Sequence, residues 1–219
     1  MNDFDVSIFY IKFVQKNNHI VIFYKKPSFV DLPIPFIIFM LDKINPKPFM
    51  MNKCIFLDRD GVLNVDRVDY VYRVEDFIIP EGTIEALQKL KNAGYLLIVI
   101  TNQSGIAKGI YTREDVMKCH HYLQEQCGNI LDDIYFSPHH EKFTTASLTR
   151  KPDSLMIEKA MAKYRIDPMK SWMIGDAHRD IKAGKKAGVR TIHITHKPEE
   201  SHSEITTNTL LEASDRVLR

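Results

Sequence analysis

The sequence predicts an α/β fold in which a central parallel sheet lies between two layers of helices. Two observations lead to this prediction. Short apolar runs, typical of buried strands, alternate with longer segments of helical spacing from about residue 53 to residue 195. The chain has 219 residues, of which 44% are apolar, and this is enough for one domain with a sizeable core.

The elements follow one another in a regular order. The first strand is predicted at 55–57, where three apolar residues run into two aspartates and a glycine. The segment 80–95 has apolar residues at helical spacing and ends at Gly94, and Thr112 caps a second helix. The same signals predict strands at 96–101, 132–138, 171–176 and 189–195, helices at 112–128, 151–166 and 179–188, and a last helix with a short final strand at 208–219. This alternation forms βαβ units, so we expect a Rossmann-like three-layer sandwich.

The first fifty residues differ from the rest in composition. They contain no Ala, Gly, Glu, Arg or Thr, yet they hold eight of the twelve Phe and five of the ten Pro. Their longest apolar stretch, 33–41, is too short to cross a bilayer and contains prolines. Asp3 and Asp5 stand where a signal peptide needs basic residues. We therefore expect neither a membrane span nor a signal peptide.

We expect the native protein to start at Met50 or Met51, with residues 1–50 as an upstream extension that has no catalytic role. A membrane-peripheral arm is the alternative. The extension carries six Lys and four Asp, so residues 51–219 hold 24 basic and 24 acidic side chains. A domain of zero formal charge lacks the broad basic surface of a nucleic-acid binder, so we expect no nucleic-acid partner.

The cysteines indicate a reducing compartment. Cys54, Cys119 and Cys127 are few, odd in number and without the spacing of metal ligands. Reduced thiols in a cytoplasmic protein are the simplest interpretation.

Polar side chains stand where the predicted strands end. In an open parallel sheet these ends border one crevice, in which ligands bind. The residues concerned are Asp58 and Asp60 after the first strand, Thr101 at the end of the second, Lys151 before the third helix, and Asp176 and Asp180 after the fourth strand. Any one of them alone reads as a turn or cap residue, but together they indicate a site.

The chemistry of these side chains indicates phosphoryl transfer. Several carboxylates in one place repel one another, so the site needs a cation, and few hard oxygen ligands suit Mg²⁺. Asp58 would attack phosphorus as the nucleophile and form an aspartyl-phosphate. Asp60 would protonate the leaving oxygen and later deprotonate water. Mg²⁺ and Lys151 would supply the positive charge that an attack on an anion requires.

Four segments resemble the motifs of the haloacid dehalogenase superfamily of phosphohydrolases, in the right order over roughly residues 53–195. They are "FLDRDGVLN", "TNQSG", "RKP" and "GDAHRD". Within the superfamily, "EDFIIPEG" and "TNQSGIAKGIYT" are most similar to the phosphatases of sugar bisphosphates, with the histidinol-phosphate phosphatases as near relatives. The resemblance implies that residues 51–219 are a phosphatase domain that releases the C7 phosphate of a heptose 1,7-bisphosphate.

The resemblance also implies a role for each matching residue. Asp58 would be the nucleophile and Asp60 the acid and base, and Mg²⁺ would be held by Asp58, the backbone carbonyl of Asp60, and Asp176. Asp180 would orient Lys151 or a metal-bound water. The phosphoryl oxygens would contact Thr101, the backbone of Asn102, Gln103 and Ser104, and Lys151, while Arg150 would bind the distal part of the sugar phosphate. The short link after the first strand leaves no room for a large cap domain, so a small, open, monomeric enzyme is expected.

Two departures from the family pattern stand out. Relatives often hold a structural zinc before "RKP" with cysteines at positions that here are Ser137, Ser147 and Thr149. Only His139 remains, and one histidine cannot hold a tetrahedral zinc, so we expect no zinc and a loop, 140–149, that is mobile or held by local hydrogen bonds. The second departure is Ala177, where relatives usually have a substrate-contacting lysine.

Three alternatives to this function stay open at the level of sequence. Histidinol phosphate is the rival substrate within the family. A polynucleotide 3′-phosphatase shares a similar "TNQ" segment, but the zero charge of 51–219 argues against it. A phosphosugar-binding protein without activity is the non-enzymatic reading, and the presence of both Asp58 and Asp60 argues against it.

Overall fold

The computed structural model describes residues 12–16, 19–23 and 51–219. The chain divides into two units, Met1–Met50 and Met51–Arg219. In the first, β1 (Lys12–Lys16) and β2 (His19–Phe23) pair antiparallel, with Lys16 opposite His19. The apolar stretch 33–41 and most of the expected N-terminal extension lie outside the described residues.

The second unit is built on a six-stranded sheet in which every pair of neighbours is parallel. The strand order across the sheet is β5-β4-β3-β6-β7-β8. The chain leaves β3 toward β4 on one side and later returns to β6 on the other, so the direction of winding changes at β3. The strands are β3 (Cys54–Leu57), β4 (Leu96–Asn102), β5 (Asp133–Ser137), β6 (Trp172–Gly175), β7 (Arg190–Ile194) and β8 (Ile205–Thr207).

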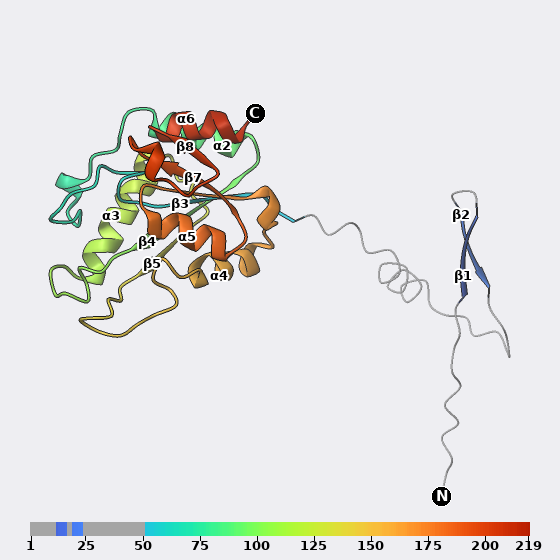
Figure 1. Cartoon of the computed structure of the whole chain (residues 1–219), viewed down its shortest axis with the longest axis horizontal. Helices are drawn as coiled ribbons and strands as arrows, with labels where there is room; N and C mark the ends of the chain where they lie inside the picture. The colour runs from blue at the N-terminus through green and yellow to red at the C-terminus, as the bar shows by residue number, and fades with distance from the viewer. Residues whose placement is uncertain (1–11, 17–18, 24–50) are drawn as a thin grey trace, which may run out of the picture. The chain divides into compact units, whose positions relative to one another are not determined.

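Helices cover both faces of this sheet, which completes the three layers predicted from the sequence (Figure 1). The buried side chains of α2, α3 and α6 join one apolar cluster, and those of α4 join a second cluster together with Ala183 of α5. The helices are α2 (Thr83–Asn92), α3 (Arg113–Gln126), α4 (Leu155–Tyr164), α5 (His178–Lys186) and α6 (Leu210–Val217), with short 3₁₀ turns η1 (Val74–Asp76), η2 (Pro168–Lys170) and η3 (Pro198–Glu200).

Strand β3 lies in the middle of the core. Ile55 and Leu57 point into the cluster that contains α2, α3 and α6, while Cys54 and Phe56 point into the other. All four are fully buried, because a strand covered by helices on both faces reads as a continuous apolar run. Each large apolar side chain buried in this way stabilises the fold by roughly 1.5–3 kcal/mol. The burial of β3 therefore holds the carboxyl end of this strand in a fixed position.

The predicted elements are present with shifted ends. Helix α4 begins at Leu155, four residues later than predicted, because 151–154 form a turn. The short final strand, β8, precedes the last helix instead of lying within 208–219. The link from β3 to α2 contains turns and η1, which agrees with the expected absence of a large cap domain.

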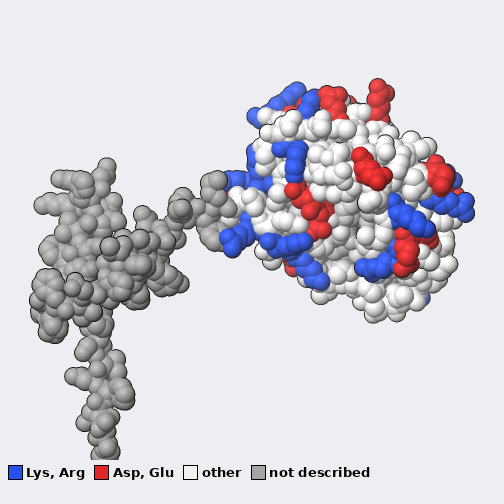
Figure 2. All heavy atoms as spheres, turned by 180° about the vertical axis from the view of Figure 1, so that it is seen from behind, with Lys and Arg blue, Asp and Glu red and all other residues white. Residues whose placement is uncertain are grey.

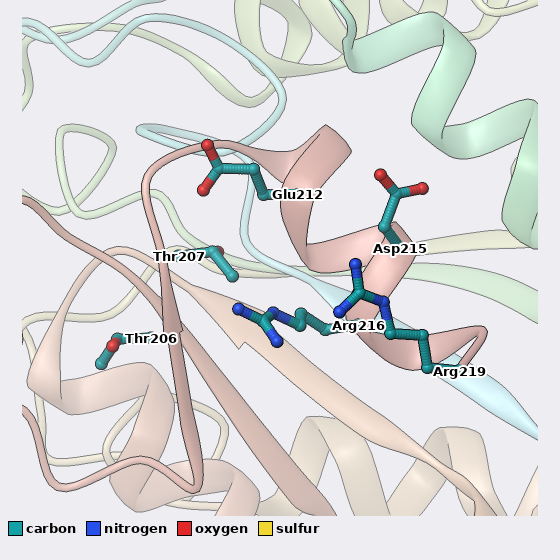
Figure 3. A pocket seen from close by; sticks show the side chains of 6 residues that line it. All are labelled: Thr206, Thr207, Glu212, Asp215, Arg216 and Arg219. Carbon is teal, nitrogen blue, oxygen red and sulfur yellow. The ribbon is translucent and has the colours of Figure 1, made fainter.

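Two surface features bear on function. On the face shown in Figure 2, Lys and Arg side chains are interspersed with Asp and Glu, so this face of the described residues has no broad basic patch. A pocket of about 160 Å³ lies between β8 and α6, and Figure 3 shows the acidic and basic side chains around it. No predicted site residue lines it, and β6 and β7 separate β8 from β3 in the sheet. Among the residues that the structure describes, none of the helices has both the length and the apolar character of a membrane span.

Candidate active site

The site is built around Asp58, which directly follows β3 at the strand where the winding changes direction. In doubly wound sheets this is the place where ligands bind. The backbone N–H of Asp58 donates to the carbonyl of Ile174 at 2.9 Å, which extends the pairing of β3 with β6. The side chain is buried, and its Oδ1 accepts a hydrogen bond from the Arg59 backbone N–H at 2.7 Å. The carboxylate is therefore held in one orientation.

Lys151 contacts Asp58 through a fully buried ammonium group. Its Nζ lies 2.8 Å from Oδ1 of Asp58, 2.7 Å from Oδ1 of Asp180 and 2.6 Å from the carbonyl oxygen of Ile100. The ammonium group therefore contacts two carboxylates and one backbone carbonyl. Burial lowers the pKa of Lys151, but the Asp180 and Asp58 carboxylates raise it more, so the net direction is upward. The side chain therefore remains charged.

Asp58, Asp176 and Asp180 form a carboxylate cluster in which one oxygen of each lies within 4.8 Å of the others. Burial, followed by the charge of Asp180, raises the pKa of Asp58 to about 8 although Lys151 opposes this. The same two causes raise the pKa of Asp176 to about 6. The cluster has more negative charge than Lys151 can neutralise.

The residues of the cluster fit a hard divalent cation such as Mg²⁺. Asp176 Oδ1 is buried and has no hydrogen-bond partner among the described residues, so this oxygen is available to a cation. Asp180 is engaged otherwise, because its Oδ1 contacts Lys151 and its Oδ2 accepts from the Ala177 backbone N–H at 3.1 Å. Gly61 allows the backbone after Asp60 to pass close to the Asp176 side chain, because a Cβ at residue 61 would lie 2.0 Å from Asp176 Oδ2.

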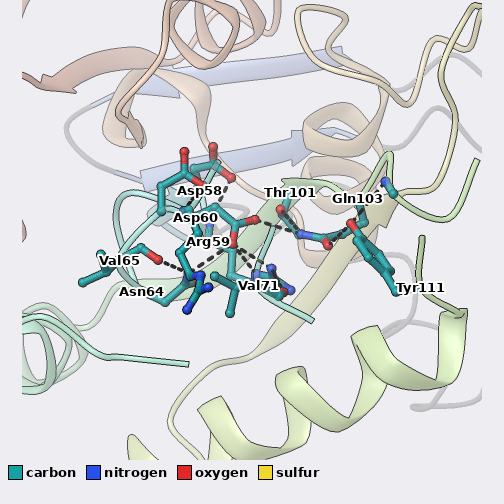
Figure 4. Close-up of polar contacts among 12 residues, drawn as sticks. Asp58, Arg59, Asp60, Asn64, Val65, Val71, Thr101, Gln103 and Tyr111 are labelled. Atoms are coloured by element: carbon teal, nitrogen blue, oxygen red, sulfur yellow. Dashed lines mark hydrogen bonds and ion pairs between the residues drawn. The ribbon is translucent and has the colours of Figure 1, made fainter. Parts of the chain in front are cut away.

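Asp60 belongs to a second hydrogen-bond network beside the first. Figure 4 shows its side chain between Arg59 and Gln103. Oδ1 accepts from Arg59 Nη2 at 2.7 Å and from Asn64 Nδ2 at 3.1 Å, and Oδ2 accepts from Gln103 Nε2 at 2.9 Å. The Tyr111 hydroxyl donates to Gln103 Oε1 at 2.8 Å and so fixes the amide. Asp60 keeps 17% of its side chain exposed, which leaves it within reach of substrate and water.

The residues at the end of β4 connect the two networks. Thr101 is fully buried, and its hydroxyl oxygen accepts from Gln103 Nε2 at 3.0 Å. The amide of Asn102 pairs with the backbone of Lys151 in both directions, each hydrogen bond being 3.0 Å long. The backbone N–H of Gln103 donates to the carbonyl of Ser137 at 2.8 Å, while Ser104 is buried beside them. Asn102 and Gln103 thus serve to hold Lys151 and Asp60.

Arg150 lies beside Lys151 and is half-buried. Its Nη1 donates to the His139 carbonyl oxygen at 3.1 Å. Burial lowers the pKa of Arg150, and the nearby charge of Arg179 lowers it further. We find the rest of its guanidinium available for a ligand, because no ion pair with a described residue involves it.

A cluster of three hydroxyls holds the loop before Arg150, at the positions where relatives have cysteines. The Ser137 and Thr149 hydroxyl oxygens are 3.1 Å apart, and those of Ser147 and Thr149 are 2.8 Å apart. The Thr149 backbone N–H also donates to Ser147 Oγ at 3.3 Å. This is the local hydrogen bonding that the sequence allowed as one of two possibilities for the loop.

Three contributors to the site were not identified from the sequence. Arg59 is buried to 1% exposure and fixes Asp60, and its position between two aspartates was the only available signal. Tyr111 orients Gln103, and the absence of a side chain at Gly105 leaves space for the Tyr111 ring. His193 on β7 contacts the Asp176 carbonyl oxygen through Nε2 at 2.9 Å and Ser201 through Nδ1 at 2.9 Å, and nothing local in the sequence indicates these contacts.

Comparison with known proteins agrees with this geometry. The model of the haloacid dehalogenase-like hydrolase family matches residues 69–194, more than half of the chain. The D-glycero-beta-D-manno-heptose-1,7-bisphosphate 7-phosphatase of Haemophilus ducreyi is 39% identical over 150 residues, which cover 65% of this chain and 82% of the relative. The D-glycero-alpha-D-manno-heptose-1,7-bisphosphate 7-phosphatase of Photorhabdus laumondii is 39% identical over 164 residues, which cover 68% and 88%.

Among solved structures, the chain is similar to the D,D-heptose 1,7-bisphosphate phosphatase from B. bronchiseptica complexed with magnesium and phosphate. The two are 25% identical, with a TM-score of 0.69, and the match covers 76% of this chain and 98% of that one. Together with the parallel sheet and the carboxylate cluster at its switch point, these matches confirm the resemblance seen in the motifs. This chain belongs to the haloacid dehalogenase-like hydrolase family.

Proposed function

We propose that this protein is a Mg²⁺-dependent phosphatase that removes the C7 phosphate from a D-glycero-D-manno-heptose 1,7-bisphosphate. The observation that carries the proposal is the contact of Lys151 with Asp58 and Asp180 beside the unpartnered carboxylate oxygen of Asp176. This arrangement offers a nucleophile, a fixed positive charge and a place for a divalent cation, which phosphate monoester hydrolysis needs. The heptose-1,7-bisphosphate 7-phosphatases among its relatives support the substrate.

The carboxylates of Asp58 and Asp176, with the backbone carbonyl of Asp60, would hold the Mg²⁺. Once bound, Mg²⁺ would offset the charge of the cluster and of the incoming phosphate. Lys151, 2.8 Å away, favours the charged, nucleophilic form of Asp58, and a bound cation would act in the same direction against the burial that raises the pKa of Asp58. Asp180 holds Lys151 in place and is not itself needed as a ligand.

The reaction runs in two displacements. In the first, a carboxylate oxygen of Asp58 attacks phosphorus, the bond to the sugar oxygen breaks, and Asp60 donates its proton to that oxygen. In the second, water attacks phosphorus and gives a proton to Asp60, which releases inorganic phosphate and restores Asp58. Oδ2 of Asp60 accepts one hydrogen bond, from Gln103, and so retains a lone pair for the transferred proton.

Thr101 and Ser104 are the proposed contacts to the phosphoryl oxygens. The Thr101 hydroxyl accepts from Gln103, so its own proton remains free to be donated to a phosphoryl oxygen. Ser104 is a candidate for a backbone contact, whereas the backbone N–H of Gln103 already donates to the Ser137 carbonyl.

A substrate panel tests the proposal. Phosphate release would be measured with both anomers of the heptose 1,7-bisphosphate, histidinol phosphate, a 3′-phosphorylated oligonucleotide and p-nitrophenyl phosphate, with MgCl₂ or EDTA. We expect kcat/KM to be at least tenfold higher for one heptose bisphosphate than for every other class, and EDTA to abolish turnover. Equal or better turnover of histidinol phosphate or of the oligonucleotide would contradict the substrate assignment.

We further propose that the enzyme acts as a cytoplasmic monomer. Its three cysteines are all buried and free, which suits a reducing compartment. Light scattering after size-exclusion chromatography tests the monomer, and a dimer at micromolar concentration would contradict it.

A further inference from the structure

Arg179 is a cation at the site to which the proposed mechanism gives no role. It lies in the first turn of α5, next to Asp180, and its side chain is exposed. In the part of the chain that the structure describes, its guanidinium makes no ion pair within 4.0 Å and no hydrogen bond. An arginine has five N–H donors, so this group is free to bind a ligand.

The ion pair between Lys151 and Asp180 brings the two chain segments that carry Arg150 and Arg179 to the same part of the site. Lys151 Nζ and Asp180 Oδ1 are 2.7 Å apart, and Arg150 and Arg179 are the chain neighbours of these two residues. The charge of Arg179 contributes to the lowered pKa of Arg150, after burial. Burial also opposes the charge of Arg179, but the carboxylates of Asp180, Asp58, Asp176 and Asp66 raise its pKa overall. The guanidinium therefore lies within the electrostatic reach of the carboxylate cluster.

The like charges of Arg150 and Arg179 repel each other, and neither guanidinium forms an ion pair with a carboxylate of the described residues. Arg150 donates only to the His139 carbonyl oxygen, which carries no net charge. Lys108 is another nearby cation, and its Nζ donates a hydrogen bond to the Tyr70 hydroxyl at 2.6 Å. A phosphate group would offset both charges, because its oxygens match the planar fork of donors that each arginine presents.

We propose that Arg179, together with Arg150, binds the second phosphate of the substrate, the one that is not hydrolysed. This inference rests on the proposed function, since it requires a bisphosphate. The attacked phosphate lies at Asp58, where the cation site, Thr101 and Lys151 serve its oxygens. The second phosphate needs cations at the rim of the same crevice, and Arg150 and Arg179 provide them. Arg179 is thus a specificity residue that selects bisphosphates over monophosphates.

The test compares substrates with one and two phosphates. For wild type, Arg179→Ala and Arg179→Lys, kcat and KM would be measured with the heptose 1,7-bisphosphate and with p-nitrophenyl phosphate. We expect Arg179→Ala to raise KM for the bisphosphate about 10- to 100-fold, the typical effect of a lost charged hydrogen bond. The ratio of the two kcat/KM values should fall at least tenfold. Arg179→Lys should recover part of that ratio because it keeps the charge.

Lys185→Ala is the matched control, since it removes one exposed positive charge from the same helix. Its ratio of kcat/KM values should equal that of the wild type. If Arg179→Ala slows both substrates by the same factor, Arg179 acts only on the carboxylates and the inference is wrong. If wild type prefers the bisphosphate and Arg179→Ala keeps that preference, the inference fails alone. If the wild type shows no such preference, the proposed function is wrong, and the inference is wrong as well because it requires a bisphosphate substrate.

Discussion

Asp58 connects the chemistry of the site to the stability of the protein. Its pKa is raised to about 8 by burial and by Asp180, and that of Asp176 to about 6, whereas the ordinary value is 3.8. Between about pH 4 and pH 8 the folded, metal-free protein therefore binds protons that the unfolded chain has released. The free energy of unfolding then falls as pH rises through this range.

The first prediction is that Mg²⁺ stabilises the protein more at pH 8 than at pH 6. At pH 8 the cluster has lost its protons, so the cation removes repulsion that protons no longer relieve. We expect MgCl₂ to raise Tm at least about 3 °C more at pH 8 than at pH 6, which is roughly 1 kcal/mol for a chain of this size. Thermal unfolding with EDTA or MgCl₂ at both pH values measures this.

Asp58→Asn should remove most of this pH dependence and abolish turnover while the protein stays folded. The exposed Glu114→Gln on α3 is the control and should leave the difference between the two pH values unchanged. A Mg²⁺ effect on Tm that is equal at pH 6 and pH 8 in the wild type would contradict the assignment of these carboxylates.

The second prediction concerns Lys151, whose ammonium group contacts Asp58, Asp180 and the Ile100 carbonyl. Lys151→Met keeps an unbranched side chain, one atom shorter, and removes its charge. We expect kcat to fall at least about 100-fold, because a preorganised charge at the reacting group is lost. Tm should also fall, since two buried carboxylates lose their partner. Steady-state kinetics and thermal unfolding measure both effects.

Lys159→Ala is the control for Lys151, because this exposed lysine on α4 lies in the next helix and outside the site. It should retain wild-type kcat within twofold. A normal kcat in Lys151→Met would show that the ammonium has no part in neutralising the phosphoryl group.

At the level of elements, the loop between β5 and α4 is held at its end by contacts among three hydroxyl groups. Thr149 contacts the hydroxyls of both Ser137 and Ser147, and it directly precedes Arg150. Ser137 is fully buried, so its hydroxyl depends on this partner. The hydroxyl cluster therefore fixes the start of the segment that carries Arg150 and Lys151.

The third prediction follows from this contact. Thr149→Val keeps the shape of the side chain and leaves the Ser137 and Ser147 hydroxyls without it, at a cost of about 1 kcal/mol. We expect Tm to fall about 2–4 °C and KM for the bisphosphate to rise severalfold through Arg150, with kcat changed less. Thr145→Val, exposed in the same loop, is the control. A rise in KM shared by both variants would mean that the loop, and not the hydroxyl cluster, positions Arg150.

The same loop shows what the sequence could and could not reveal. Asp58, Thr101 and Asp176 were predictable because a parallel sheet brings the carboxyl ends of its strands to one edge. The partners of Asn102 and Gln103 were not predictable, since they lie 49 and 43 residues away and depend on how the loops fold back. Strand β8 was misplaced because its three residues lie at the edge of the sheet, where pattern signals are weak.

At the scale of the whole molecule, the net charge of the domain differs from the local charge of its site. Residues 51–219 have a formal charge of zero, and acidic and basic side chains mix on the surface in Figure 2. Yet the site concentrates Asp58, Asp176 and Asp180 within 4.8 Å. A small phosphorylated ligand can use such a local field, whereas a long polyanion needs an extended basic surface. This favours a sugar phosphate over a polynucleotide as substrate.

The fourth prediction is that residues 51–219 fold and act without residues 1–50. Every residue of the candidate site lies between Asp58 and His193, and the chain divides into its two units between Met50 and Met51. The shortened protein should therefore keep kcat/KM within twofold and Tm within about 2 °C of the full chain, because it retains both apolar clusters and the complete site. Parallel kinetics and thermal unfolding of the two proteins measure this. A loss of more than tenfold in kcat/KM, with the shortened protein still folded, would give residues 1–50 a part in the reaction.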